Sequence, residues 1–479
     1  MELRKAAFSG LRIQFYLRVS NTVFYQVSAV VLAILLVPRD FALVGLAMVF
    51  VGFTLSIADF GLGSALIQRP SGLKDALTTG ASLRLLISSV LAVVLVAVAP
   101  IVGVLYGEPA LTVLIWSLSP LLILNFMGFV SRVTLTKNLQ FRRVFLPDVL
   151  GGAVQAVVAI VLAFSGFSYW SLVAGQLAGT SAGVAALYYM LPWRLHWELD
   201  RSLVSELLRF GMPLIFAGVL YFLFQNVGVA VLGAVSLPGV GYFLFAQTWT
   251  ISIPLGLRAS FDHVMFPVFS AMNGEIARVT RAYEKLFKYL VWIVAPGSAF
   301  LAAAAPSFVL SLVGPIWSPS IPVLQILAIA GFAIMLSLTY HSAVLALGLS
   351  REILKYNAIA LALAAPLSVV AVTVGGAVGL AWAFLVVGGG LLVWAFFRAE
   401  RIMPGSTGVV VVPLAQACLG SVLCALPFAL VQSLVPPSLL ALAFQGLGAI
   451  GLYFVAMTLV TRGYFLKELT SLVGSVIRA

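Results

Sequence analysis

Seven ionisable residues lie inside long apolar segments of the chain, where a charged side chain is costly and usually faces a cavity or an opposite charge. Four are arginines and three are aspartates: Arg18, Asp59, Arg84, Arg132, Asp148, Arg258 and Asp262. The excess of arginine predicts a cationic cavity, and the planar guanidinium group suits the oxygens of a phosphate. We therefore expect an anionic ligand, whereas a pump for cationic compounds would present acidic groups.

Depth within the segment separates the arginines by expected role. Arg132 lies close to a segment end, from which a long side chain snorkels to the interface at small cost, and the same structural role is expected for Asp148. Arg18 and Arg84 lie deeper and share their helix faces with polar residues, so we expect both to line a cavity. Arg258 is compatible with either role.

The remaining two aspartates have two candidate roles. Asp59 and Asp262 could carry a coupling proton or cation, or they could neutralise a neighbouring arginine. We favour charge pairing for both.

A polar stripe marks the first apolar segment. Its members follow one another at spacings of four, three, four and three residues, which places them on one helix face: Gln14, Arg18, Asn21, Tyr25 and Ser28. Such a stripe is typical of the wall of an aqueous vestibule. Gln247 and Arg258 form a shorter stripe of the same kind in a later segment.

A second basic feature has a helical spacing of three, four and three: Arg278, Arg281, Lys285 and Lys288. These residues could hold anionic lipid headgroups, or they could be an ordinary positive flank that sets membrane topology.

Several kinds of catalytic chemistry lack their motifs. None of the seven lysines follows a glycine, so the chain has no phosphate-binding G-x-x-x-x-G-K-[ST] loop. The three histidines are far apart and form no H-E-x-x-H motif, and no Asp-x-Asp pair is present. We expect no enzyme activity, no metal and no cofactor, but transport without chemistry on the substrate.

The elements that must position these residues follow from composition. Of 479 residues, 62% are hydrophobic and 9% are charged, against about 25% charged in soluble domains. This excludes a soluble enzyme and predicts an all-α polytopic membrane protein. Apolar stretches long enough to cross a bilayer predict about fourteen transmembrane helices: 12–37, 41–67, 77–104, 110–136, 147–166, 169–192, 209–234, 240–265, 283–304, 320–349, 354–374, 377–399, 406–433 and 438–461.

Charge orients these helices. By this assignment 22 of the 27 basic residues fall in loops on one side, which identifies that side as cytoplasmic and places both termini there. The net charge of +12 is thus explained by topology, and nucleic acid is not an expected partner.

A weak internal repeat suggests the domain organisation. Residues 44–47 at the start of the second segment resemble residues 240–243 at the start of the eighth. We expect two six-helix bundles, residues 1–192 and 209–400, joined by a cytoplasmic amphipathic linker at 193–208. Two extra helices and a short tail follow at 401–479.

Several short motifs, in this order, resemble a known family, the Wzx-type polysaccharide flippases, whose superfamily also holds lipid II flippases and MATE exporters. They are Asp59-Phe60-Gly61 before Gln68-Arg69, Arg132 with Leu139-Gln140-Phe141, Arg209-Phe210-Gly211, Phe266-Pro267 with Phe269, and Trp317 before residues 322–327. The resemblance covers nearly the whole chain. Arg84 and Arg258 depart from the family pattern, which has other polar residues there.

The resemblance implies two six-helix bundles around a central cavity that opens alternately to each side. It also implies that undecaprenyl-pyrophosphate-linked oligosaccharide is carried across the bacterial cytoplasmic membrane for exopolysaccharide, capsule or O-antigen assembly. We expect Arg18, Arg84 and Arg258 to contact the pyrophosphate. The polar residues Gln14, Asn21, Tyr25 and Gln247 would contact the substrate as well, those of the first segment through sugar hydroxyls.

Two alternatives stay open. An ion-coupled MATE-type exporter of small molecules would depend on Asp59 or Asp262. A membrane scaffold for polysaccharide assembly would depend on residues 193–209 or 270–288 and would tolerate changes in the cavity. Expected partners are the lipid-linked oligosaccharide and anionic lipids, with a polysaccharide polymerase and glycosyltransferases as further candidates.

Overall fold

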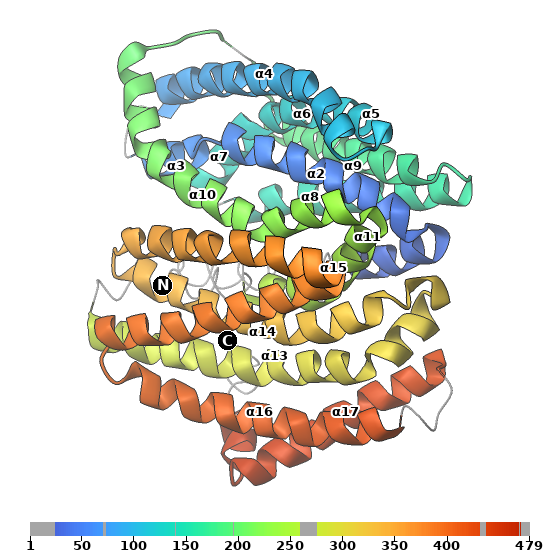
Figure 1. The fold of residues 1–479 in the computed structure, drawn as a ribbon. Helices are drawn as coiled ribbons and strands as arrows, with labels where there is room; N and C mark the ends of the chain where they lie inside the picture. Colours follow the sequence, from blue (N-terminus) through green and yellow to red (C-terminus); the bar gives the residue numbers. More distant parts are fainter. Residues whose placement is uncertain are drawn as a thin grey trace. The chain divides into compact units, whose positions relative to one another are not determined.

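Helices make up all the regular structure in the described part of the chain, shown in a computed structural model (Figure 1). The structure describes residues 24–69, 73–138, 140–194, 196–258, 275–431, 437–468 and 470. Helices are the expected answer to this composition, because a backbone in lipid must satisfy its own hydrogen bonds.

The elements in chain order are as follows. A helix at Phe24–Leu35 precedes α2 (Pro38–Ala58), α3 (Leu62–Gln68), α4 (Leu73–Leu105), α5 (Pro109–Leu118), α6 (Leu121–Met127), α7 (Phe129–Lys137), α8 (Phe141–Phe164), α9 (Tyr169–Met190) and α10 (Arg201–Val235). Then come α11 (Leu237–Gln247), the π-helical turn η1 (Thr248–Ser252), α13 (Ile276–Leu312), the 3-10 turn η2 (Pro315–Trp317), α14 (Ser320–Ala346), α15 (Ser350–Ile402), α16 (Ser406–Val431) and α17 (Leu439–Val460).

The expected membrane spans coincide with these helices. Eleven helices among the described residues are long and apolar enough to cross a membrane. One of them, Arg351–Ile402, contains two expected segments that meet at Gly376, where the backbone leaves helical geometry with a φ of 55°. The expected segment 169–192 coincides with Tyr169–Met190, and the described part of the expected segment 12–37 contains the helix Phe24–Leu35. The multi-pass, all-helical fold class is confirmed, whereas the count of fourteen spans stays a prediction.

The helices pack into two units. The first comprises the chain up to Leu244 together with Leu354–Gly376, and the second comprises Phe245–Ile353 and Ala377–Ala479. In the first, α8 and α9 pack side by side, and α2 packs against α4, α5 and α10 (Figure 1). In the second, α13 packs against α14, α16 and α17. The expected division at residues 192 and 209 rested on sequence repetition and stays a prediction.

The segment before α10 differs from the expected start of the seventh span. The described residues between Met190 and Arg201 are not helical, and α10 begins at Arg201, where we expected 209. The reason is local, because the Asp200 carboxylate caps the helix by accepting hydrogen bonds from the backbone N–H groups of Ser202 and Leu203. The hydrogen bond from the Ser202 hydroxyl lowers the pKa of the Asp200 carboxyl group most. The backbone N–H groups of Ser202 and Leu203 lower it further.

An enclosed lysine ties the end of the second unit's chain to α13. Lys288 Nζ lies 2.7 Å from Glu468 Oε1 and donates a hydrogen bond to the Tyr464 hydroxyl. The ammonium group also lies 5.1–5.2 Å from the ring centres of Tyr289, Trp292 and Tyr464. Of the four basic residues that could hold lipid headgroups or set topology, Lys288 is therefore bound within the protein.

This ion pair predicts a stability effect. Replacing Glu468 with Gln removes the charge at constant size, and we expect the free energy of unfolding to fall by about 1.5 kcal/mol at neutral pH. The hydrogen bond from Lys288 holds the pKa of Glu468 below its ordinary value of 4.5. The stabilisation is therefore present above pH 4.5 and is lost as the pH falls through the folded-state pKa.

Unfolding in detergent at several pH values tests this prediction. Glu275→Gln serves as the control, because the Glu275–Arg278 pair is more than half exposed and contributes about 0.5 kcal/mol or less. Equal stability of the two variants at neutral pH would contradict it.

Candidate functional site

A left-handed turn interrupts the helix that carries Asp59. Asp59 is the C-cap residue after α2, and the next two residues, Phe60 and Gly61, have φ angles of 47° and 60° before α3 begins. Gly211 of α10 packs directly on this turn, since a Cβ atom there would lie 2.2 Å from the Phe60 carbonyl oxygen. Interrupted membrane helices often mark binding sites, because their unwound backbone faces a cavity or buried partner.

Arg84 of α4 reaches this turn. Its NH1 atom donates a hydrogen bond to Asp59 Oδ1 at 2.6 Å, and its guanidinium group lies 4.4 Å from the centre of the Phe129 ring on α7. The arginine side chain is 10% exposed and the aspartate side chain 61% exposed. Arg84 Nε is buried without a hydrogen-bond partner in the described structure. The pair is thus a buried cation held by one exposed carboxylate, with a donor still unused.

Two other basic side chains of the first unit have partners close by. Arg132 of α7 forms a two-point ion pair with Asp148 of α8, with an NH2–Oδ1 distance of 2.5 Å. Lys137 Nζ donates to the carbonyl oxygens of Leu66 and Arg69 at the end of α3. Both side chains hold α7 against its neighbours, and the expected snorkelling of Arg132 stays a prediction.

The other proposed contact residues of the described chain lie apart from this pair in sequence. Tyr25, in the helix Phe24–Leu35, is 56% exposed. Gln247 ends α11 directly before the π-helical turn, and Arg258 donates from NH1 to the Leu338 carbonyl oxygen of α14. Gln247 and Arg258 belong to the second unit. Gln14, Arg18, Asn21 and Asp262 lie outside the described residues.

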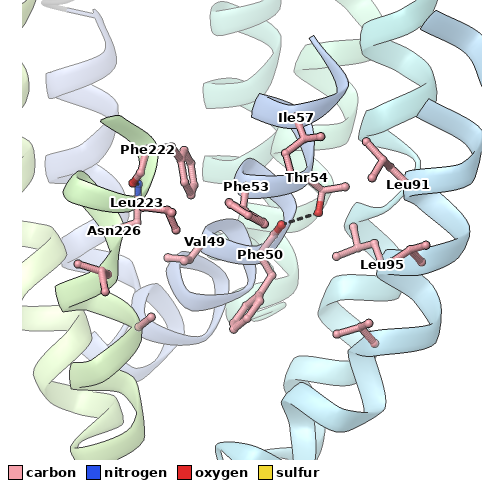
Figure 2. Close-up of a pocket in the computed structure, with 14 residues that line it drawn as sticks. Val49, Phe50, Phe53, Thr54, Ile57, Leu91, Leu95, Phe222, Leu223 and Asn226 are labelled. Carbon is pink, nitrogen blue, oxygen red and sulfur yellow. Dashed lines mark hydrogen bonds between the residues drawn. The ribbon is translucent and has the colours of Figure 1, made fainter. Parts of the chain in front are cut away.

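An apolar cavity of about 460 Å³ lies between α2, α4 and α10 of the first unit. Figure 2 shows Val49, Phe53 and Ile57 of α2 facing it, with Leu91 across the space on α4. Its two polar side chains, Thr54 and Asn226, donate to carbonyl oxygens of their own helices. The cavity therefore presents hydrocarbon surface to a ligand.

Sequence reasoning missed three features of these units. The Phe129 ring beneath Arg84 is one aromatic residue among many and gives no pattern signal. The cavity is a space between helices, which no residue spacing announces. A third feature, in the second unit, is the buried Glu352, which accepts hydrogen bonds from Arg398 and Tyr340. The sequence did offer one signal for this site, since Glu352 is an acidic residue next to two basic ones, Arg351 and Lys355.

Comparison with known proteins now decides the family. A family model described as "Polysaccharide biosynthesis protein" matches residues 31–322, more than half of the chain. The chain belongs to this family. The resemblance to Wzx-type flippases drawn from the short motifs is confirmed.

Individual relatives agree with this assignment. The lipopolysaccharide biosynthesis protein WzxC of Escherichia coli K12 is 25% identical over 81% of this chain and 79% of its own length. Among solved structures, the lipid II flippase MurJ in an inward closed conformation matches 94% of this chain and 99% of its own with a TM-score of 0.80, at 15% identity. An inward-facing multidrug transporter of the MATE family matches 82% and 99% at 0.63, with 18% identity. This family member therefore has the fold of MurJ and MATE transporters.

Proposed function

We propose that this protein is a flippase that carries a polyprenyl-pyrophosphate-linked oligosaccharide across the bacterial cytoplasmic membrane by alternating access. The product would serve exopolysaccharide, capsule or O-antigen assembly. The observation that carries the proposal is membership of a polysaccharide biosynthesis family together with a fold that matches a lipid II flippase over nearly the whole chain. A lipid-linked sugar would agree with both comparisons, since one family description names polysaccharide biosynthesis and the structural match is a lipid II flippase.

The charged residues support an anionic handle on the substrate. The Asp59 side chain is 61% exposed and is bonded to Arg84, so a phosphate that approaches from the Asp59 side would meet the guanidinium group there. Arg18 and Arg258 are proposed as further pyrophosphate contacts. Gln14, Asn21, Tyr25 and Gln247 are proposed to contact the sugars.

Topology and partners complete the proposal. The distribution of basic residues supports cytoplasmic termini and a substrate that enters from the cytoplasmic leaflet. A polymerase and glycosyltransferases are proposed as neighbours in assembly, and anionic lipids as surface ligands of Arg278, Arg281 and Lys285.

An ion-coupled exporter of small molecules has less support. Of the two carboxylates on which it could depend, Asp59 compensates Arg84 at 2.6 Å, and Asp262 lies outside the described residues. The MATE transporter structure also matches this chain with a lower TM-score, 0.63, than the lipid II flippase structure, 0.80.

Proteoliposomes test the proposed function directly. Purified protein is reconstituted with fluorescent undecaprenyl-pyrophosphate oligosaccharide, and the fraction of label that a membrane-impermeant quencher reaches is followed over time. We expect wild type to equilibrate the label between leaflets and Arg84→Gln to slow this at least about tenfold, because a phosphate contact is lost.

Two comparisons complete the experiment. Arg39→Gln is the control, because Arg39 pairs with Glu108 in an exposed position and should leave the rate unchanged. No translocation by folded wild-type protein, with or without proton and sodium gradients, would overturn the proposed function. A normal rate in Arg84→Gln would overturn only the role of Arg84.

A further inference from the structure

We infer that the apolar cavity between α2, α4 and α10 binds the isoprenoid chain of the lipid-linked substrate while its phosphate lies toward Arg84. This inference rests on the proposed function and adds to it a site for the lipid part. Figure 2 shows the cavity between the three helices, and the dashed line marks Thr54 Oγ1 bonded to the Phe50 carbonyl oxygen.

The lining selects the chemistry of the occupant. Thr54 and the amide nitrogen of Asn226 are bonded within their own helices, and the remaining lining side chains are apolar. A sugar or phosphate here would lose its hydrogen bonds to water without replacement, at a substantial cost. A hydrocarbon chain has no hydrogen bonds to lose, and it gains van der Waals contacts with the apolar side chains of the cavity wall. The volume lies within the range of about 300–1,000 Å³ that is usual for ligand pockets.

Part of the cavity wall is exposed on α4, a helix long and apolar enough to cross a membrane. Val94 and Val98 of α4 line the cavity and are 49% and 38% exposed, in a span that is mostly unburied within the protein. A lipid chain can therefore enter sideways without crossing water. Entry of this kind suits a ligand that is already dissolved in the membrane.

The shape suits a chain that lies along the helices. The lining residues extend from Val49 to Ile57 on α2 and from Phe222 to Ala230 on α10, each about 12 Å of helix. The cavity therefore runs along the helices, as a hydrocarbon chain that lies beside them requires.

The charged pair lies beyond one end of the cavity. Ile57 lines the cavity and Asp59 follows two residues later, while Leu91 lines it on α4 about 10 Å along the helix from Arg84. Because Asp59 and Arg84 are bonded to each other, both helices place this end of the cavity near the same cation. A lipid that occupies the cavity can thus direct its anionic head toward Arg84.

Photolabelling tests the assignment without relying on transport. The probe is a polyprenyl phosphate with a diazirine in its chain, added to protein in vesicles of phosphatidylethanolamine and phosphatidylglycerol. We expect label on the peptides of α2, α4 and α10 that line the cavity. Val94→Trp should fill the space and lower this labelling about tenfold. Val93→Trp is the matched control, because Val93 precedes Val94, is 70% exposed and does not line the cavity.

The outcomes separate the two proposals. Loss of labelling and of translocation in Val94→Trp alone supports the inference. Equal labelling or equal translocation by the two variants overturns it while leaving the flippase function intact. Equal labelling by a diazirine phosphatidylethanolamine, not displaced by excess polyprenyl phosphate, also overturns it in favour of an ordinary membrane lipid. Absence of translocation by wild type overturns the proposed function, and the labelling still decides the cavity.

Discussion

Replacing Asp59 with alanine is expected to lower the free energy of unfolding by about 3–5 kcal/mol, more than replacing Arg84 does. The reason is the unequal burial of the two side chains, 10% exposed for Arg84 and 61% for Asp59. Without Asp59, the guanidinium group stays buried with Phe129 as its neighbour and no carboxylate to compensate it. Without Arg84, the carboxylate is already placed where water can hydrate it.

A double-mutant cycle measures this asymmetry. We expect Arg84→Met to cost less than Asp59→Ala, since methionine fills much of the space and leaves no buried charge. The double variant should then be more stable than Asp59→Ala alone, because it removes the uncompensated cation. Equilibrium unfolding in mixed micelles with increasing amounts of a denaturing detergent gives the free energy of unfolding of wild type, the two single variants and the double variant. A double variant as unstable as the sum of the single variants would contradict the pairing.

The pairing shows how far the sequence reaches. Charge balance within the apolar segments favoured an arginine partner for Asp59, but it could not say which arginine, because the two residues are 25 positions apart on different helices. Which pair forms depends on how α2 and α4 pack. The ion pair of Lys288 with Glu468 spans 180 positions and was missed for the same reason.

The helices themselves could be predicted because composition nearly determines them. A segment of about 20 apolar residues has one way to satisfy its backbone in lipid, whatever its neighbours do. Boundaries set by a side chain were less accessible, as the start of α10 shows. Asp200 caps that helix with a carboxylate that sequence reasoning had assigned to a linker.

The apolar cavity lies at the opposite limit. Each of its lining residues has the type expected of a membrane helix, so no residue marks the space. Only the distances between α2, α4 and α10 create it. Its recognition therefore required coordinates, whereas the charged pair beyond one end of the cavity was visible in the sequence as two separate residues.

Replacing Gly211 with alanine is expected to displace the turn that carries Asp59. A Cβ atom at this position would lie 2.2 Å from the Phe60 carbonyl oxygen, and backbone cannot rotate away as a flexible side chain can. Overpacking of this kind costs about 1–3 kcal/mol or more. Because the turn aligns Asp59 with Arg84, the same change should also slow translocation.

Gly218 provides the matched control on the same helix. An added Cβ atom there meets nothing within 4 Å, so Gly218→Ala should gain up to about 1 kcal/mol from the better helix propensity of alanine. The two alanine variants should therefore differ in the free energy of unfolding by about 1–4 kcal/mol, with opposite signs relative to wild type. Unfolding in mixed micelles and translocation in proteoliposomes measure both effects. If Gly211→Ala matched Gly218→Ala in both assays, close packing of α10 on the Asp59 turn would not be what positions the Asp59–Arg84 pair.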